Sequence, residues 1–292
     1  MYNRSQALLR QTMFLGPAIV MYSLIIAVPF VLSLYYSFTN WNGISTRYDW
    51  IGMGNYRTVF LHDPDFIRSF WFSTKITFAI TVLTNVLGFG LAYALMSRFK
   101  FRNVWRTVFF VPNVLGGLLL GFIWRFIFTS GFPVIGRLTD IPFFQQSWLG
   151  TEATSFWALV IVSVWQNMGY VMVIYIAGLS ALSQEVQEAA RIDGANEFQS
   201  LFRMKLPMLM SSITVCLFLT INFTYKMYDL NLSLTKGGPF RSSESVALNI
   251  VEEAFVNNNY ALGTAKAVLF LLVIAAVTSA QVYATKRMEV DA

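Results

Sequence analysis

Long apolar runs, separated by short polar segments, dominate the chain. Each run is long enough to cross a hydrocarbon core of about 30 Å as a helix of about 20 residues. The runs are continuous and contain Gly and Ala, which favours helices over the alternating strands of about ten residues that build membrane barrels. We therefore predict an all-α, polytopic membrane protein with about six transmembrane helices. These helices are expected at residues 13–37, 70–96, 105–128, 155–180, 210–228 and 262–284.

Composition supports a membrane domain and argues against a soluble one. The 292 residues are 56% hydrophobic and 12% charged, and that charged fraction is about half that of ordinary soluble domains. No linker is long enough to mark a second domain, so residues 1–292 are expected to form a single transmembrane domain. The first run is too long for the apolar part of a signal peptide and has no clear small-residue cleavage site, so we expect it to be retained.

Basic residues predict the orientation of the chain. The net charge is +6, but the basic residues cluster beside the apolar runs, which indicates membrane orientation rather than nucleic-acid binding. They lie between the second and third runs and near both termini, which places both termini in the cytoplasm. Residues 129–154 are then outside and residues 181–209 inside. The outer loop at 38–69 carries charges of both signs and is weaker evidence.

Few residues are available for catalysis or metal binding. A single cysteine, Cys216, excludes an internal disulfide, and one histidine, His62, with no cysteine pair provides no zinc site. We therefore predict no catalytic residues and no metal site. Lys75 and Lys266 lie about one turn inside their runs, where lysines usually extend to the membrane surface.

Two short helices are predicted between the fourth and fifth runs. Ser183 can begin the first, and Gly194 ends it at low cost. Asn196 and Gln199 have the spacing of a capping box at the start of the second. Pro207 marks the bend at which the fifth transmembrane helix begins.

The second short helix carries an apolar stripe on its surface. Phe198, Leu201 and Phe202 recur at i, i+3 and i+4 on a segment that the charge pattern places in the cytoplasm. The stripe either packs back against the protein's own helix ends or inserts into a groove of a soluble partner. The sequence leaves both possibilities open.

A family signature lies in this same segment. Glu188-Ala189-Ala190, then Gly194, then Met204-Lys205-Leu206-Pro207 resembles the cytoplasmic EAA signature of binding-protein-dependent ABC importer permeases. That signature reads E-A-A, three residues, G, nine residues, I-x-L-P. Every spacing matches, and the one departure is Met204 in place of isoleucine, which is a tolerable apolar exchange.

The resemblance extends along most of the chain. Residues 191–195, Arg-Ile-Asp-Gly-Ala, resemble the carbohydrate-uptake branch of the family. Residues 50–56 are similar to its F-x-G-x-x-N-Y stretch in the first outer loop. Residues 234–239, Leu-Thr-Lys-Gly-Gly-Pro, resemble the L-T-x-G-G-P turn of the larger, MalF-like member of the permease pair.

The resemblance implies a fold, partners and a mechanism. It implies a type I ABC importer permease in the bacterial inner membrane, which pairs with a second homologous permease and works by alternating access. It also implies two cytoplasmic ATPase subunits and an extracytoplasmic solute-binding protein that delivers a sugar. No G-x-x-x-x-G-K-[ST] phosphate loop is present, so ATP and Mg are expected on the ATPase partner and no cofactor on this chain. The residues that the resemblance assigns to the ATPase contact are Glu188, Ala189, Ala190, Asp193, Gly194, Leu206 and Pro207, within a coupling loop at about 183–207.

A sugar site inside a membrane needs hydrogen-bonding side chains and flat apolar rings. The candidates on the fourth run are Trp165, Asn167 and Tyr170, and those on the fifth are Asn222, Thr224, Tyr225 and Tyr228. The alternative is that these side chains form interhelical hydrogen bonds, worth about 0.6 kcal/mol on average. Gly117 and Gly121 have the GxxxG spacing that permits close helix packing.

Two other functional classes remain as alternatives. A secondary transporter or channel that works alone predicts inverted repeats and buried acidic residues, yet the centres of the runs carry no Asp or Glu. A membrane-embedded enzyme needs a polar catalytic cluster, and the sequence offers no candidate for one. Copurification with an ATPase discriminates between the importer and the stand-alone transporter.

Overall fold

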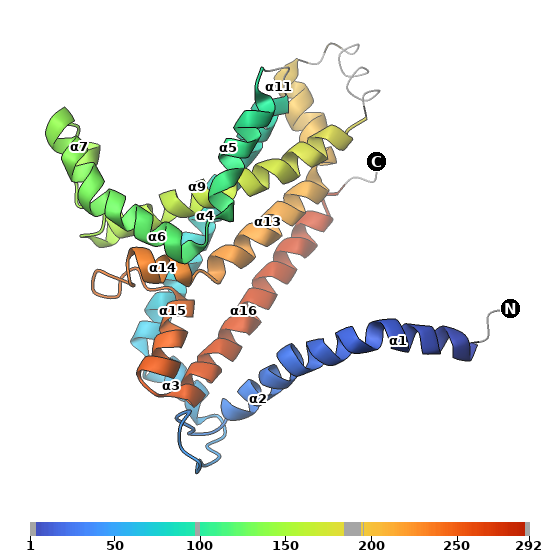
Figure 1. Cartoon of the computed structure of the whole chain (residues 1–292), viewed down its shortest axis with the longest axis vertical. Helices are drawn as coiled ribbons and strands as arrows, with labels where there is room; N and C mark the ends of the chain where they lie inside the picture. The colour runs from blue at the N-terminus through green and yellow to red at the C-terminus, as the bar shows by residue number, and fades with distance from the viewer. Residues whose placement is uncertain (1–3, 97–99, 184–193, 195, 290–292) are drawn as a thin grey trace. The chain divides into compact units, whose positions relative to one another are not determined.

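The computed structural model describes the chain apart from residues 1–3, 97–99, 184–193, 195 and 290–292, and the described part is predominantly helical (Figure 1). The longer helices are α1 (Arg4–Tyr22), α2 (Val28–Tyr36), α4 (Pro64–Met96), α5 (Arg102–Val114), α6 (Gly117–Phe126), α9 (Glu152–Ala181), α13 (Met210–Tyr225) and α16 (Tyr260–Lys286). The shorter helices are α3 (Gly54–Leu61), α7 (Phe132–Thr139), α8 (Pro142–Gln145), α11 (Glu197–Ser200), α12 (Leu206–Met208), α14 (Asp229–Leu234) and α15 (Val246–Val251). Four π-helical turns complete the set: η1 (Ser23–Ala27), η2 (Ile127–Gly131), η3 (Leu201–Lys205) and η4 (Glu252–Val256).

The predicted all-α membrane fold is confirmed. Among the described residues, five helices are long and apolar enough to cross a membrane, and a bent helix pair raises the number to as many as six. The five are Met13–Tyr36, Pro64–Met96, Gly117–Thr139, Glu152–Ala181 and Tyr260–Lys286. The bent pair is Glu197–Met208 with Met210–Tyr225.

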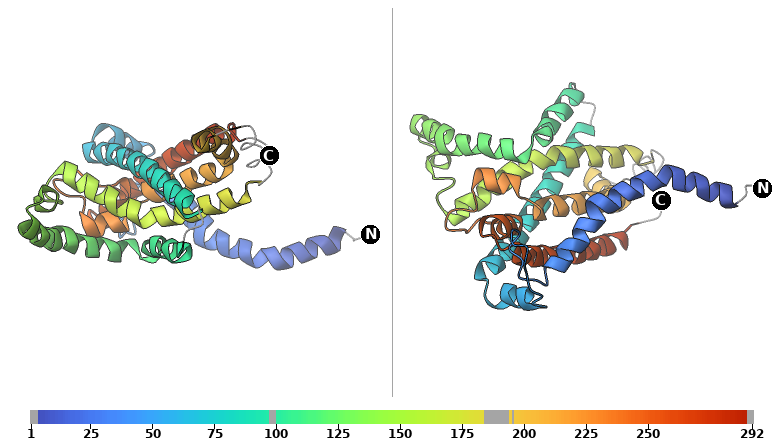
Figure 2. Two further views of the ribbon diagram at one scale, coloured as in Figure 1. Left: turned by 90° about the horizontal axis from the view of Figure 1, so that it is seen from above. Right: turned by 60° about the horizontal axis from the view of Figure 1, so that its bottom comes forward.

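The third predicted span was wrong in its bounds. Residues 105–128 do not form one helix, because the chain leaves the helical conformation at Leu115 and Gly116 between α5 and α6. Pro112 lies in the last turn of α5 and has no amide hydrogen to donate, and Gly116 and Gly117 follow the extended Leu115, so the helix ends at Val114. Helical structure instead continues through η2 and α7 to Thr139, into the segment predicted to be an outer connector. Figures 1 and 2 both show the change of direction between α5 and α6.

Contacts divide the chain into two compact units. The first contains residues 1–64 and 250–270, and the second contains residues 65–249 and 271–292. In the first unit, the loop after α2 is held by side-chain hydrogen bonds. Asn55 donates to the carbonyl oxygens of Ser37 and Thr39 at 2.9 and 2.7 Å, and the hydroxyls of Tyr56 and Ser37 lie 2.7 Å apart.

Lys266 in the first unit does not extend to the membrane surface, and that prediction was wrong. Its residue exposure is 0%, and its Nζ lies 2.6 Å from Oδ2 of Asp63 and 2.9 Å from Oε2 of Glu253. Asn259 donates a further hydrogen bond to the other carboxylate oxygen of Glu253 at 2.7 Å. Ion pairs with these two carboxylates replace the lost hydration of the ammonium group, which offsets the free-energy cost of burying it.

The second unit has a core in which α4, α9 and α13 share a polar centre. Asn85 of α4 donates to the hydroxyl of Thr220 on α13 at 3.1 Å and accepts from the hydroxyl of Tyr175 on α9 at 2.8 Å. All three residues are buried. Apolar clusters lie around this centre, and they include Ile76, Ile80, Leu159, Val162, Val171 and Met172.

The predicted features of the segment after α9 agree with the part that the structure describes. Asn196 and Gln199 form the capping box, with hydrogen bonds of 2.8 and 3.1 Å, and Gly194 has a φ of +75°. The bend of 70° falls at Leu209, two residues after Pro207. The rings of Phe198 and Phe202 lie 4.5 Å apart at a tilt of 40° and are 71% and 51% exposed, so the chain's own described residues do not cover these two rings of the stripe.

Candidate functional site

A pocket of about 600 Å³ lies in the second unit, halfway along α9. This volume is within the range of about 300–1,000 Å³ that is typical of small-molecule sites. Asn167, one of the residues that line the pocket, is in the middle of α9, which runs from Glu152 to Ala181, and so lies near the middle of that candidate membrane span. The pocket is lined by Asn113, Gly117, Ser163, Gln166, Asn167, Tyr170, Phe223, Thr224, Lys226, Met227, Tyr228, Asp229 and Leu230.

Two helix breaks meet at the pocket. The first separates α5 from α6, and the second is the short connection from Lys226 to Tyr228 between α13 and α14. Non-helical backbone at membrane depth is tolerated only where it is buried in protein or lines a cavity. These breaks therefore explain why a polar pocket exists inside an otherwise apolar domain.

Close packing between α6 and α14 fixes the position of the second break (Figures 1 and 2). A Cβ atom at Gly121 would lie 1.9 Å from the Ser233 hydroxyl, and one at Gly117 would lie 3.2 Å from Cβ of Asp229. The hydroxyl of Ser233 donates to the carbonyl of Asp229 at 2.7 Å. The predicted GxxxG packing is thus confirmed, with α14 as the partner.

Gly169 allows α5 and α9 to pack as closely as α6 and α14 do. A Cβ atom at Gly169 would lie 1.9 Å from the carbonyl oxygen of Phe109 on α5. The side chain of Gln166, one turn away, donates a hydrogen bond of 3.0 Å to the carbonyl of Leu115. This bond satisfies a backbone acceptor that the end of α5 leaves unpaired in the helix. The α5–α6 break is therefore held by α9 itself.

The wall of the pocket combines amides, hydroxyls and aromatic rings. The amide of Asn167 donates to the carbonyl of Ser163 at 2.8 Å, which fixes the orientation of its side chain. The rings of Tyr170 and Phe223 lie edge to face at 6.4 Å on facing helices. Such a set of a few convergent polar groups beside flat apolar surfaces can bind a small polar molecule with hydroxyl groups.

Of the predicted substrate residues, Asn167, Tyr170, Thr224 and Tyr228 line this pocket. The other three lie elsewhere. Trp165 packs into the apolar core against Trp124 at 5.5 Å, Tyr225 is buried with its hydroxyl 3.4 Å from that of Thr74, and Asn222 donates to the carbonyl of Phe218.

Sequence reasoning missed several lining residues, namely Asn113, Gln166, Lys226 and Asp229. Lys226 and Asp229 are exposed in the described structure and flank the second break. A signal for the pocket was present, because Pro112 and the pair Gly116–Gly117 interrupt an otherwise continuous run. The second break, between α13 and α14, carries no such signal in the sequence, since no proline or glycine marks the end of α13.

The predicted ATPase-coupling residues fall only partly within the described chain. Glu188, Ala189, Ala190 and Asp193 lie outside the described residues. Gly194 is described at its positive φ, and Leu206 and Pro207 form α12 with Met208, immediately before the bend into α13.

Residues 84–290 match the family described as "Binding-protein-dependent transport system inner membrane component". The chain is 41% identical over 279 residues to a probable starch degradation products transport system permease protein, AmyD, of Thermoanaerobacterium thermosulfurigenes, covering 96% of this chain and 94% of the relative. It is 32% identical to the multiple sugar-binding transport system permease protein MsmF of Streptococcus mutans, over 90% of each chain.

The fold is similar to that of a solved importer chain. It superimposes with a TM-score of 0.83 on a chain of a bacterial ABC transporter involved in the import of the acidic polysaccharide alginate. The match covers 98% of this chain and 99% of the other at 15% identity, a level that supports the fold alone. The family match and the relatives together establish that this multi-pass membrane protein belongs to the binding-protein-dependent transport system inner membrane component family.

Proposed function

We propose that the chain is the permease subunit of an ATP-driven importer of neutral oligosaccharides, and that the pocket at the two helix breaks binds the sugar. The observation that carries this proposal is the polar, aromatic-lined cavity near the middle of a membrane span. The whole chain, residues 1–292, acts as one permease domain that alternates between inward-open and outward-open states.

The charge of the pocket favours an uncharged sugar. Lys226 and Asp229 contribute one positive and one negative charge, and the other lining residues are neutral. A site for an acidic polysaccharide needs an excess of positive charge, because buried carboxylates are costly unless they are paired. The names of AmyD and MsmF, which refer to starch degradation products and to multiple sugars, support the same substrate class.

The energy for transport comes from partner subunits. Two cytoplasmic ATPases bind ATP and Mg, a second homologous permease completes the pathway, and an extracytoplasmic binding protein delivers the sugar. A periplasmic protein of this kind, loaded with alginate pentasaccharide, is present in a solved complex of the alginate transporter. Both termini of this chain lie in the cytoplasm, and Glu188, Ala189, Ala190, Asp193 and Gly194 contact an ATPase subunit. The exposed Phe198 and Phe202 stripe supports this contact, since the described chain leaves it uncovered.

The sugar site is tested by transport in vesicles that contain the assembled importer. Tyr170→Ala removes a hydroxyl and a ring from the wall of the pocket, and we expect uptake of a labelled maltodextrin to fall at least about 10-fold because both polar and apolar contacts are lost. Trp165→Phe, five residues away on α9 but outside the pocket, is the matched control and should retain uptake. Equal uptake by Tyr170→Ala and the control would refute this site.

ATPase coupling is tested at Glu188. Glu188→Lys reverses the charge that we assign to a basic group of the ATPase, so the complex should lose sugar-stimulated ATP hydrolysis. Normal stimulation in reconstituted vesicles would contradict the assignment. Sugar uptake by this chain purified alone would instead support a stand-alone transporter.

A further inference from the structure

A second pocket, of about 1,100 Å³, opens where α4 and α9 begin. It shares no lining residue with the pocket at the two helix breaks, which we call the inner pocket. We call the second one the α4–α9 pocket. Its aromatic side chains come from α4, from α9 and from the turn after α14, and they include Trp71, Phe156, Trp157 and Phe240. Its charged side chains are Arg68, Lys75 and Glu152.

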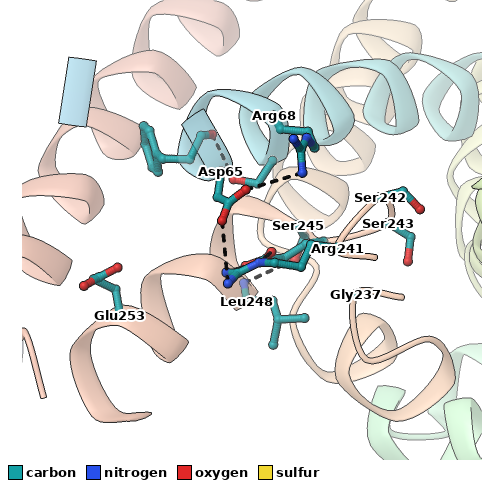
Figure 3. Close-up of polar contacts among 12 residues, drawn as sticks. Asp65, Arg68, Gly237, Arg241, Ser242, Ser243, Ser245, Leu248 and Glu253 are labelled. Atoms are coloured by element: carbon teal, nitrogen blue, oxygen red, sulfur yellow. Dashed lines mark hydrogen bonds and ion pairs between the residues drawn. The ribbon is translucent and has the colours of Figure 1, made fainter. Parts of the chain in front are cut away.

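The charges around the α4–α9 pocket balance one another, which favours a neutral ligand. Oδ1 of Asp65 lies 3.4 Å from a guanidinium nitrogen of Arg68, and its Oδ2 lies 3.8 Å from one of Arg241 (Figure 3). Arg241 also pairs with Glu244 at 2.5 Å. Three cations at or beside the lining are thus matched by three carboxylates, namely Arg68, Lys75 and Arg241 against Asp65, Glu152 and Glu244. The pocket therefore has no net charge with which to select an anion or a cation.

The combination of flat rings and charged groups suits a sugar. Trp71 and Trp157 are 58% and 50% exposed, so their rings are accessible to a ligand. The apolar faces of sugar rings pack on aromatic rings, and their hydroxyl groups form hydrogen bonds that are strengthened by a charged partner. Membrane anchoring explains single tryptophans near helix ends. It does not explain why aromatic rings and charges of both signs line one concave site.

The α4–α9 pocket lies on the same face of α9 as the inner pocket. Glu152 and Phe156 line the first pocket, and Ser163 and Tyr170 line the second. Their spacings of 4, 7 and 7 residues place all four within about 40° around the helix axis. Between them on α9 lies Leu159, which is fully buried, so the two pockets are separate cavities in this structure. A ligand that moves along this face of α9 would meet one pocket after the other.

The wall that carries Phe240 is held in place by hydrogen bonds. Asn231 of α14 is 0% exposed. Its amide donates to the carbonyl of Ser243 at 2.8 Å, and its side-chain oxygen accepts from the amide of Ser245 at 2.9 Å. The carboxylate of Asp65 also links this turn to α4. A wall that is ordered before binding lowers the entropy cost of binding a ligand.

We propose that the α4–α9 pocket is a second binding site for a neutral oligosaccharide, whose sugar rings stack on Trp71 and Trp157. Its hydroxyl groups bond to Arg68, Lys75 and Glu152. This inference rests on the proposed function, because a sugar importer brings an oligosaccharide to this face. The pocket has about 1,100 Å³ against about 600 Å³ for the inner pocket, so it holds more sugar units. By the predicted topology it lies on the outer side, where delivered sugar first meets the permease.

Protection of a cysteine by sugar, in vesicles that contain the assembled importer, tests the second site. Ala153→Cys places a thiol at an exposed position of the pocket wall, and the native Cys216 is buried. We expect maltoheptaose to slow the reaction of this thiol with a polar maleimide. Trp71→Ala/Trp157→Ala should raise the maltoheptaose concentration for half-protection at least about 10-fold, because two stacking contacts are lost.

Two further variants control for general effects of the substitutions. Trp50→Ala/Trp105→Ala removes two exposed tryptophans that line neither pocket, and it should leave protection unchanged. Glu152→Gln keeps the shape of the wall and replaces a charged acceptor by a neutral one, so it should raise the half-protection concentration about 3-fold. This variant keeps the test decisive if the loss of two rings prevents assembly.

Tyr170→Ala separates the two sites, because Tyr170 lines only the inner pocket. Protection that persists in Tyr170→Ala supports the second site. Loss of uptake in Tyr170→Ala, with no protection of Ala153→Cys in the parent importer, overturns the second site and leaves the proposed function standing. Normal uptake in Tyr170→Ala contradicts the inner site instead. Two other results overturn the second site: equal effects of the two double tryptophan variants, and a thiol at position 153 that is unreactive before sugar is added, since lipid or another subunit then fills the pocket.

Discussion

Replacing Lys266 by methionine tests whether the buried ion cluster stabilises the first unit. The ammonium group lies 2.6 and 2.9 Å from the carboxylates of Asp63 and Glu253, whose side chains are each only 14% exposed. Methionine has a similar volume, so the change removes charge without leaving a large cavity. Two carboxylates then remain close together without the ammonium, and breaking a buried ion pair in this way costs about 3–5 kcal/mol.

The free energy of unfolding, measured by reversible denaturation in a neutral detergent, should fall by that amount. Lys286→Met is the control, because Lys286 lies in the last turn of the same helix and is exposed. It should cost less than about 1 kcal/mol, the contribution of a cation at a helix C-terminus. Adding Asp63→Asn and Glu253→Gln to Lys266→Met should recover most of the loss, since no unpaired charge remains. The reasoning is refuted if Lys266→Met and Lys286→Met destabilise the protein equally.

Two further substitutions test the packing of the second unit. Gly169→Ala should lower the free energy of unfolding by about 1–3 kcal/mol, because its methyl group would lie 1.9 Å from the Phe109 carbonyl oxygen and α5 must move. Gly90→Ala is the control, because nothing lies within 4 Å of its added methyl group, and it should have no such cost. Equal thermal stability of the two variants would contradict this packing. Asn85→Leu removes the acceptor of the Tyr175 hydroxyl and a donor bond to α13, and thermal unfolding should show a loss of about 1–2 kcal/mol, since interhelical hydrogen bonds in membranes average about 0.6 kcal/mol each. An unchanged melting temperature for Asn85→Leu would show that this polar centre adds no stability.

The sequence was sufficient for features that depend on local composition. The long apolar runs located most spans, and the spacing of Asn196 and Gln199 located a helix start, because hydrophobic length and capping chemistry act within a few residues. The GxxxG spacing of Gly117 and Gly121 likewise predicted close packing. It did not reveal that the partner was α14, which is short and follows more than a hundred residues later.

Features that depend on contacts between residues far apart in the sequence could not be predicted from local composition. The burial of Lys266 requires Asp63, which belongs to a loop two hundred residues earlier in the chain. Hydropathy alone could not distinguish this lysine from one that reaches the headgroups. The bounds of the third span failed for a related reason, because an apolar run does not show whether a break at Leu115 and Gly116 is supported by a donor such as Gln166 on another helix.

The position of α13 connects the two parts of the proposed mechanism. Its N-terminus follows the 70° bend after α12, next to the predicted coupling loop, and its C-terminus is followed by Lys226 on the wall of the pocket. With 16 residues, α13 is about 24 Å long, and a helix of this length moves as a nearly rigid body. A displacement at the coupling loop would therefore reach the wall of the pocket directly. The wall opposite is held by Gln166 and Gly169 to α5, so movement of α13 against α9 changes the shape of the cavity. Because the proposed sugar contacts come from both walls, we expect such a movement to alter the affinity for sugar, which the proposed coupling of ATP binding to release requires.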